Sequence, residues 1–386
     1  MNDTVRQFRN FFVSLRLTVV LLVLSMILIF IATLDQVNLG IWAVQEKYFR
    51  SFFVLWPVKG VPVPVFPGGY LIGGLLLINL ISAHVYRFKL TWRKAGIFLT
   101  HIGLILLLIG ELLSGLLQEE YQMRLAEGET KNFSESYRYN ELAIIETTDP
   151  KTDAVVAIPE ETLAKQSELQ HPALPFRVVI KAYYPNAVLQ LRANVKDQPP
   201  QIATAGVGPK LVATPVPLTY KQDERNWPAA FIELVGPDGS LGTYLVSSQL
   251  AVSQTLDYAG RSWRLGLRFQ RSYKPFALTL LKVQHDVYLG TDIPKNYSSR
   301  VRVTAPDGRD NREVLIYMNN PLRYAGLTFY QYQMDSEHAT SVLQVVRNPG
   351  WLLPYISCAM MALGLVIQFG IHLFGFFGRQ RSLRVA

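Results

Sequence analysis

Three histidines lie within long apolar segments of the sequence. They are His84, His101 and His372. An ionisable side chain is costly to place at membrane depth, so such a residue marks a functional site by default. Neutral imidazole is also a standard axial ligand of haem iron. The three histidines are therefore candidates for binding haem, and His101 is the candidate for the axial ligand of its iron.

The apolar segments that carry these histidines are long enough to cross a bilayer. There are four, at residues 17–34, 70–86, 95–117 and 351–377. Each is close to or above the length of about 20 residues that a membrane-spanning helix needs. We expect a polytopic α-helical membrane protein with four transmembrane helices and a large β-rich extracytoplasmic domain between the third and the fourth. The expected divisions of the chain are residues 1–34, 35–69, 70–117, 118–349 and 350–386.

The positive charge of the chain lies beside the apolar segments. Residues 118–349 hold 25 basic and 25 acidic side chains, whereas the whole chain carries +9. Positive charge at the ends of membrane segments marks the cytoplasmic side. The charge therefore predicts cytoplasmic termini and an extracytoplasmic polar block, and it excludes nucleic acid as a partner. The basic residues that flank the segments on this side are Arg6, Arg9, Arg16, Arg87, Lys89, Arg93, Lys94, Arg379, Arg381 and Arg384.

The three histidines have similar expected depths. At about 1.5 Å per helical residue, His84 lies about 5 Å inside the cytoplasmic edge, and His101 and His372 lie about 10 Å inside it. A haem site in the inner leaflet requires imidazoles at one level. A histidine near a helix end can instead turn its polar edge to the interface, an alternative that applies above all to His84. A site shared with another subunit needs only one ligand from this chain.

The polar block reads as β-rich. Short runs of β-branched and aromatic residues alternate with Pro, Gly, Asn and Asp. Pro-Asp-Gly at 237–239 and at 306–308 predicts two hairpin turns. We expect an all-β sandwich or an open barrel, with a long loop at 198–217. The expected strands are at 143–147, 176–182, 230–235, 243–246, 263–269, 276–285, 299–303 and 312–317.

The first loop, residues 35–69, is dense in aromatic side chains. The simplest interpretation is an aromatic belt at the membrane interface. The alternative is a cover over a ligand or a docking face for another membrane subunit. Residues 44–53 could form an amphipathic helix at the interface.

Small residues flank His101 at a spacing of seven: Gly96, Gly103 and Gly110. Such spacing lets helices approach closely, so helix packing is the expected cause, although a haem face could use the same gap. Gly69 and Gly73 give a similar signal in the second segment.

Few other residues could carry chemistry. Glu111 lies about 15 Å beyond His101 along the helix, where it could pair with a partner's basic residue or with Arg50, or reach the outer interface. Cys358 is the only cysteine, which excludes disulfides within the chain, and we expect it to be buried. The remaining histidines show no metal-ligand spacing, and no hydrolase or nucleotide-binding motif occurs. These histidines are His171, His285 and His338.

An ordered set of motifs resembles one known family. The sequence reads SLRLT at 14–18, THIGL at 100–104, RLAEGE at 124–129, NPL at 320–322, GLTFYQ at 326–331 and NPG at 348–350. Together with the four-helix layout, these motifs resemble the ResB family, the membrane subunit of system II cytochrome c biogenesis. The chain looks like one of its shorter members.

The resemblance implies a function. ResB-type proteins pair with a CcsA-type membrane protein in the bacterial inner membrane, move haem outward and attach it to apocytochrome c. His101 matches the family's membrane histidine, whereas His84 and His372 have no such match. The chain would be a non-catalytic or co-catalytic subunit of a haem-attachment complex, with no catalytic residue of its own. Its expected partners are the CcsA-type protein, apocytochrome c, haem and membrane lipid.

Two other functions remain open from the sequence. One is a b-type electron-transfer subunit with haem held between His101 and either His84 or His372. The other is a scaffold that binds no haem. The aromatic side chains Tyr324, Phe329, Tyr330 and Tyr332 are expected to alternate into a strand core, with contact to haem or apocytochrome as the alternative.

Overall fold

The computed structural model describes residues 3–150, 152–219, 225–250, 252–290, 294–306, 308, 310–335 and 339–385. The chain divides into two compact units. The first, which we call the helical unit, holds the segments before Glu120 and after Val346. The second, the β unit, holds Glu120–Thr219 and Asp223–Val346. His338 lies outside the described residues.

The helical unit contains four helices that are long and apolar enough to cross a membrane, as the sequence predicts. The helices are α1 Asp3–Phe12, α2 Leu15–Val44, α3 Gly69–Tyr86, α4 Ala95–Leu117 and α6 Leu353–Val385, and the 3₁₀ turn η2 Trp92–Lys94 precedes α4.

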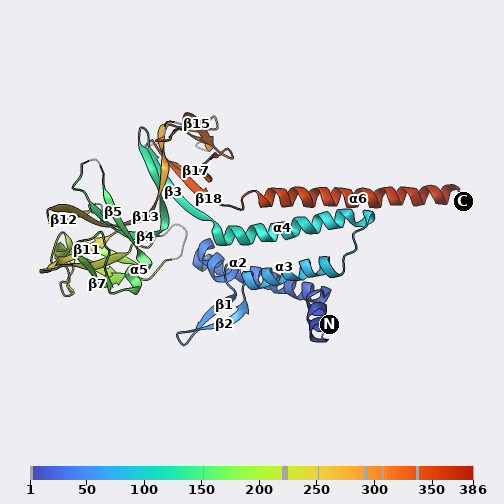
Figure 1. Ribbon diagram of the computed structural model, residues 1–386, viewed down its shortest axis with the longest axis horizontal. Coiled ribbons are helices and arrows are strands. Elements are labelled where there is room, and N and C mark those ends of the chain that lie inside the picture. The colour runs from blue at the N-terminus through green and yellow to red at the C-terminus, as the bar shows by residue number, and fades with distance from the viewer. Residues whose placement is uncertain are drawn as a thin grey trace. The chain divides into compact units, whose positions relative to one another are not determined.

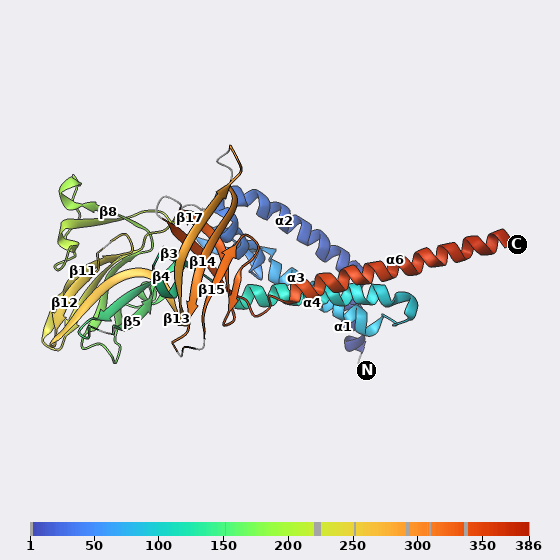
Figure 2. The same ribbon diagram turned by 90° about the horizontal axis from the view of Figure 1, so that it is seen from above.

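Helices α4 and α6 pack closely along a stripe of glycines. Figures 1 and 2 show α6 alongside α4 and continuing past its end. A Cβ atom at Gly96 would lie 2.5 Å from the Gly364 carbonyl oxygen, and one at Gly103 would lie 2.7 Å from Met361 Cγ. Gly110 faces Leu353 at 3.0 Å. The spacing of seven therefore serves helix packing, as expected. Gly73 differs from the expectation, because a Cβ there would meet nothing within 4 Å.

A polar clasp joins α3 to the junction of α1 and α2. Asn79 is 3% exposed, and its Nδ2 donates to the carbonyl oxygens of Phe12 at 2.7 Å and Ser14 at 3.2 Å. Thr18 Oγ1 donates to Asn79 Oδ1 at 2.6 Å. A buried amide must satisfy both its donors and its acceptor, and this one does. The clasp fixes the basic ends of α2 and α3 side by side.

The opposite end of α2 turns back on itself. Gly40 has φ 76°, a backbone conformation that glycine adopts without strain, and it breaks the helix. The chain continues as the π-helix η1 Gln45–Phe49. Lys47 Nζ then lies 2.6 Å from Asp35 Oδ2, to which Tyr48 also donates at 2.8 Å.

A β-hairpin follows, which the sequence did not predict. Its strands are β1 Phe53–Val58 and β2 Val61–Pro67. Residues 44–53 are thus helical only as far as Phe49, so the expected amphipathic helix is shorter than its range. β-branched residues alternate with proline here, and the Lys59-Gly60 turn has positive φ at both positions, which favours a tight hairpin.

The β unit contains one large sheet and a smaller one. The large sheet has ten strands, in the order β15-β14-β13-β4-β3-β18-β17-β16, with β12 paired to β13 and β5 to β4. Its strands are β3 Glu119–Ala126, β4 Thr130–Glu146, β5 Ala154–Pro159, β12 Gln254–Tyr258, β13 Arg261–Val287, β14 Pro294–Thr304, β15 Asn311–Tyr317, β16 Leu322–Tyr324, β17 Leu327–Asp335 and β18 Thr340–Arg347.

The smaller sheet has the order β11-β10-β7-β6, and a separate pair joins β8 to β9. The bounds are β6 Glu168–Leu169, β7 Arg177–Tyr184, β8 Ala187–Leu191, β9 Leu211–Pro215, β10 Ala229–Gly236 and β11 Gly239–Ser247. Short helices are α5 Glu160–Lys165, η3 Arg192–Asn194 and η4 Gly208–Lys210. The expected loop at 198–217 is therefore partly ordered by η4 and β9.

Two large hydrophobic cores build the β unit, beside a smaller third cluster between the β8–β9 pair and the smaller sheet. In the first, Leu142 and Leu265 of the large sheet pack against Ile232 and Val178 of the smaller one, a sandwich arrangement. In the second, Leu278 and Phe329 belong to one cluster although their strands stand far apart in the sheet order, so the large sheet curls around its own core. The β unit thus combines the two expected architectures.

The 27-residue strand β13 passes through both cores (Figure 2). The sequence predicted two strands here, at 263–269 and 276–285. The strand is continuous, and the polar residues that suggested a break coincide with register shifts between Phe269 and Arg271 and between Tyr273 and Leu278. The Pro-Asp-Gly turn at 237–239 joins β10 to β11 as expected. The second expected turn falls partly on a residue outside the described ones, although β14 and β15 do pair, with Thr304 opposite Asn311.

Candidate functional site

His84 and His101 meet between α3 and α4. Their ring centroids lie 4.8 Å apart, with the planes at 77°. His84 is in the last turn of α3, and His101 is two turns into α4. The short connection through η2 turns the chain back, so two residues 17 positions apart in sequence come into contact. Two of the three sequence candidates therefore share one site.

Each of these rings has a buried nitrogen without a hydrogen-bond partner among the described residues. They are His84 Nε2 and His101 Nδ1. His84 Nδ1 lies 3.0 Å from the Leu80 carbonyl oxygen, which can only accept, so this nitrogen carries the proton. Nε2 of the neutral ring then has a free lone pair. This arrangement, with one nitrogen donating to a carbonyl and the other free, is typical of a metal-ligating histidine.

Two aromatic rings lie against His84. Phe88 stacks on His84, with centroids 5.1 Å apart and planes at 22°. Phe98 lies 6.3 Å from His84 and 5.7 Å from Phe88. Because these rings offer neither donors nor strong acceptors, the free nitrogens have no polar neighbour on that side. The site suits a ligand that combines a metal ion with a flat apolar surface.

The separation of the rings limits how such a ligand binds. Two imidazoles on opposite faces of one iron, each with a metal–nitrogen bond of about 2 Å, place their nitrogens about 4 Å apart and their centroids farther still. The observed 4.8 Å between centroids, with the rings edge to face, is too short for that arrangement. At most one of these two histidines could therefore be an axial ligand of a given iron.

His372 does not join the pair. It is exposed on α6, and its Nε2 lies 2.9 Å from Gln368 Nε2. Gln368 also accepts from the Ile97 backbone N–H at 3.2 Å and donates to the Arg93 carbonyl at 3.3 Å. His372 thus lies beside the start of α4, and in the described part of the chain it has no ring contact with His84 or His101.

The remaining sequence candidates have local roles or none. Arg50 pairs with Glu46 at 2.8 Å and not with Glu111, which is exposed on α4. His171 Nδ1 accepts from the Ala173 N–H at 3.2 Å, within an exposed turn. His285 stacks on Tyr297, with centroids 4.8 Å apart. No group of three or more His, Cys, Asp or Glu residues that could hold a metal ion occurs among the described residues.

The expected burial of Cys358 is wrong. The cysteine is exposed on α6, because α6 turns Ser357 and Met361 toward α4, and the next position points away from that contact.

Comparison with known proteins relates a part of the β unit to one family and a larger part of the chain to one relative. Residues 235–342 match the ResB-like family. The resemblance to ResB proteins is thus confirmed. The chain is also 27% identical over 294 residues to protein NrfI of Wolinella succinogenes, a match that covers 76% of this chain and 29% of NrfI. The chain therefore spans less than a third of the length of that relative. The ResB-like region begins within β10 and ends within β18, so it does not reach His84 or His101.

Two of the ResB-like motifs have a structural role. In the RLAEGE turn, Glu127 Oε1 accepts from the Val283 N–H at 2.7 Å and Glu129 Oε2 from the Ala126 N–H at 2.9 Å. Gly128 has φ 83° and donates its N–H to the Leu280 carbonyl at 2.8 Å. In the GLTFYQ motif at residues 326–331, Phe329 is fully buried. The first motif thus anchors the β3–β4 turn to β13.

The four aromatic residues in and beside the GLTFYQ motif fall into two groups, one packed in the second core and one exposed. Phe329 is in the second core, and Tyr324 packs against it from β16, with its ring 4.8 Å from that of Phe276. Tyr330 and Tyr332 are 37% and 46% exposed. The expectation that these rings enter a strand core is correct for the first two and wrong for the other two.

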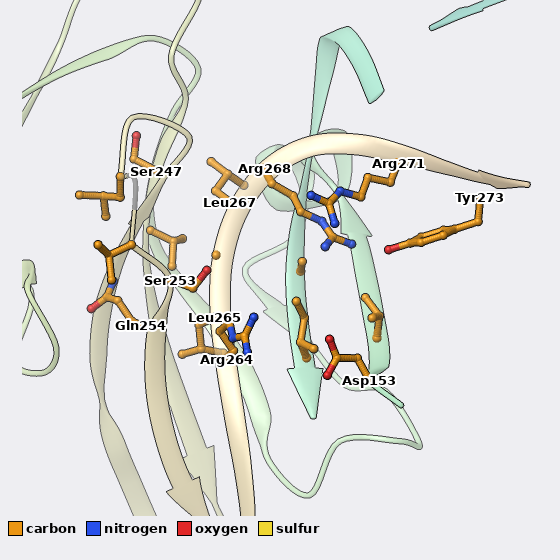
Figure 3. Close-up of a pocket in the computed structure, with 17 residues that line it drawn as sticks. Asp153, Ser247, Ser253, Gln254, Arg264, Leu265, Leu267, Arg268, Arg271 and Tyr273 are labelled. Carbon is orange, nitrogen blue, oxygen red and sulfur yellow. The ribbon is translucent and has the colours of Figure 1, made fainter. Parts of the chain in front are cut away.

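A cavity of about 580 Å³ lies against β13 in the β unit, a feature that the sequence did not reveal (Figure 3). Arg264, Arg268 and Arg271 point into it. Arg268 pairs with Glu141 at 2.9 Å, and Arg271 pairs with Glu135 at 2.9 Å. Since the carboxylates on β4 neutralise two of the three guanidinium groups, these arginines bind β13 to β4. Arginine and glutamate at facing positions of two strands were the signal in the sequence.

Proposed function

We propose that this chain is a membrane subunit of the cytochrome c maturation machinery, and that haem binds it at the His84–His101 pair on its way outward. The match to the ResB-like family supports a role in cytochrome c maturation. The observation that carries the haem step is the pair of buried nitrogens without partners, His84 Nε2 and His101 Nδ1, beside apolar rings.

Haem is the substrate in this proposal. One of the two histidines supplies one axial ligand, and a CcsA-type membrane partner supplies the other. The Leu80 carbonyl holds the His84 ring in the tautomer that leaves Nε2 free. Phe88 and Phe98 give the macrocycle an apolar wall and exclude water. Apocytochrome c accepts the haem on the outer side, at a surface formed with the partner.

The site belongs to the inner leaflet of the bacterial cytoplasmic membrane in this proposal, with both termini in the cytoplasm. Arg9, Arg16 and Arg87 support this orientation, because they line a cavity of about 540 Å³ where α1, α2 and α3 meet. Arg87 Nη1 donates to the Val13 carbonyl at 3.1 Å, so the basic residues of two sequence segments share one end of the helical unit.

The test is haem binding by the full chain in lipid nanodiscs, with and without the co-purified partner. His84→Ala, His101→Ala and the double variant are expected to lower the haem bound per protein, read from the Soret absorbance, and the yield of cytochrome c in cells. His171→Ala in the β unit is the control and leaves both unchanged. If the double variant binds as much haem as the parent and supports the same yield, the proposal is wrong: any haem in the complex is then held away from this pair, and this chain is a scaffold.

A b-type electron-transfer subunit is the alternative. It needs two axial ligands on one iron, and the distance between His84 and His101 does not allow these two histidines to be that pair. Redox titration of the purified chain alone separates the two functions. A reversible couple with one haem per chain would support electron transfer, whereas haem retained only with the partner supports maturation.

A further inference from the structure

The hairpin β1–β2 carries almost no charge. Between Ser51 and Phe66 the only charged residue is Lys59, at the tip. Val54 of β1 is buried against the helices, but eight other apolar side chains are between 38% and 63% exposed in the chain: Phe52, Phe53, Leu55, Trp56, Val58, Val61, Val63 and Val65. An apolar surface of this extent marks a site of contact with a membrane or a protein.

Both faces of the hairpin are apolar. Neighbouring residues of a strand point to opposite faces, and Leu55 and Trp56 are 49% and 51% exposed. An antiparallel sheet in water usually has one apolar and one polar face. This hairpin therefore does not have the pattern of a sheet that is solvated on one side.

The edges of the hairpin are short of hydrogen-bond donors. Pro57 is opposite Pro62, and since neither has an N–H, this is a non-hydrogen-bonded pair. Pair types alternate along an antiparallel ladder, so the pair of Leu55 and Pro64 is of the same type, and its backbone groups point outward. The outer edge of β2 consequently presents no N–H at Pro62 or Pro64. Because these prolines have no N–H to desolvate, they lower the free-energy cost of moving the edge of β2 out of water. They also prevent another strand from pairing with this edge.

Both ends of the hairpin lie at the level of one membrane boundary. Helix α3 has 18 residues, or about 27 Å, which just spans a hydrocarbon core of about 30 Å, so Gly69 must lie near its edge. Asp35 is 20 residues beyond Leu15, again about 30 Å along α2. Lys47 is bound to Asp35, and its Nζ lies 4.9 Å from the centre of the Trp56 ring. The first strand is thus tied to that level.

We propose that the β1–β2 hairpin lies in the boundary between headgroups and acyl chains of the outer leaflet, with lipid covering both of its faces. Figure 1 shows the hairpin projecting obliquely from α2 and α3, at the end of α3 remote from α1. Trp56 has the amphipathic character of an interfacial anchor, and Lys59 reaches the lipid phosphates from the tip. The proposal rests on the membrane orientation given above but not on haem binding.

Spin-label accessibility in nanodiscs of phosphatidylethanolamine and phosphatidylglycerol tests this proposal. A label at Val63→Cys, in a Cys358→Ser background, is compared with two references. Native Cys358, exposed on α6, reports the membrane, and Val188→Cys, which replaces a 42% exposed valine on β8, reports water. We expect the Val63→Cys label to collide more with oxygen than with a water-soluble nickel complex, as the Cys358 label does, and the Val188→Cys label to show the reverse.

The outcomes separate this proposal from the one above. If the Val63→Cys label behaves like that at Val188→Cys while Cys358 remains in lipid, the hairpin proposal is overturned and the membrane helices stand. If Cys358 is also in water, both fail. If the Val63→Cys label is shielded from the nickel complex only when the partner membrane protein is present, protein and not lipid covers the hairpin, and the proposal is overturned. Pro62→Thr with Pro64→Thr restores two edge donors and is expected to reduce the oxygen preference, and an unchanged ratio would overturn the argument from the edges.

Discussion

Asn348 ties the start of α6 to the end of α4: its Nδ2 donates to Ser114 Oγ at 3.0 Å. The same side chain closes the turn that precedes α6, because its Oδ1 accepts from the Gly350 N–H at 2.8 Å. A single amide thus holds two helices that are more than two hundred residues apart in sequence.

Replacement of Asn348 by alanine removes these two contacts and a longer one of 3.4 Å from Nδ2 to Gln118 Oε1, and it leaves Ser114 without this partner. We expect the free energy of unfolding to fall by about 1–2 kcal/mol, the sum of two ordinary hydrogen bonds. Thermal unfolding of the nanodisc-embedded chain, followed by circular dichroism, measures the change. Asn194→Ala, at an exposed position of η3, is the matched control and should stay within about 0.5 kcal/mol. Equal midpoints for the two variants would contradict the role of Asn348.

Gly103→Ala is expected to separate α4 from α6. The added Cβ would lie 2.7 Å from Met361 Cγ and 2.9 Å from the Ser357 carbonyl oxygen, distances that real Cβ contacts avoid. Overpacking of this kind costs about 1–3 kcal/mol. Gly73→Ala is the control, since its Cβ meets nothing within 4 Å and alanine favours the helix. The reverse order of thermal midpoints would show that the glycine stripe is not a packing contact.

Glu129 is expected to make part of the stability dependent on pH. Burial acts to raise the pKa of this carboxyl, but the Ala126 N–H and the Lys131 ammonium hold it below its ordinary value. A lowered pKa in the folded state stabilises the protein above the ordinary pKa, and this gain is lost as the pH falls through the folded value. The stability difference between the parent and Glu129→Gln, measured by urea unfolding, should therefore be largest at neutral pH and shrink below about pH 5. A difference that is constant from pH 7 to pH 4 would disprove this linkage.

Phe329→Ala is expected to destabilise the β unit by about 3–5 kcal/mol, because the ring is fully buried in the second core. Tyr332→Ala, three residues along the same strand, removes a ring that is 46% exposed and should cost much less. Near-ultraviolet circular dichroism during chemical unfolding reports the difference. If Tyr332→Ala were the more damaging variant, the exposed face of β17 would have to be covered in the folded protein.

The helices could be predicted from sequence because each long apolar segment carries its own signal in composition and length. The histidine contact could be predicted only in part. Depth along a helix follows from counting residues, so His84 and His101 were expected at one level. The rotation of each helix depends on packing against its neighbours, and so the exclusion of His372 could not be foreseen.

In the β unit, local signals located strands but not their limits. The polar stretch around Lys274 reads as a break, yet β13 continues through it, because bulges let one strand change partners. The hairpin β1–β2 was missed because its prolines suggest a loop. Its register places Pro57, Pro62 and Pro64 where a strand tolerates them, which only the paired structure reveals.

The course of β4 has a consequence for dissecting this protein. A fragment limited to residues 235–342 would retain β13 and lose β4, its partner strand between Trp263 and Thr279. It would also lack β3, and with it Met123 and Leu125 of the second core. The region shared with ResB proteins is therefore one part of a larger cooperative body. A soluble piece that is meant to fold by itself has to begin no later than β3.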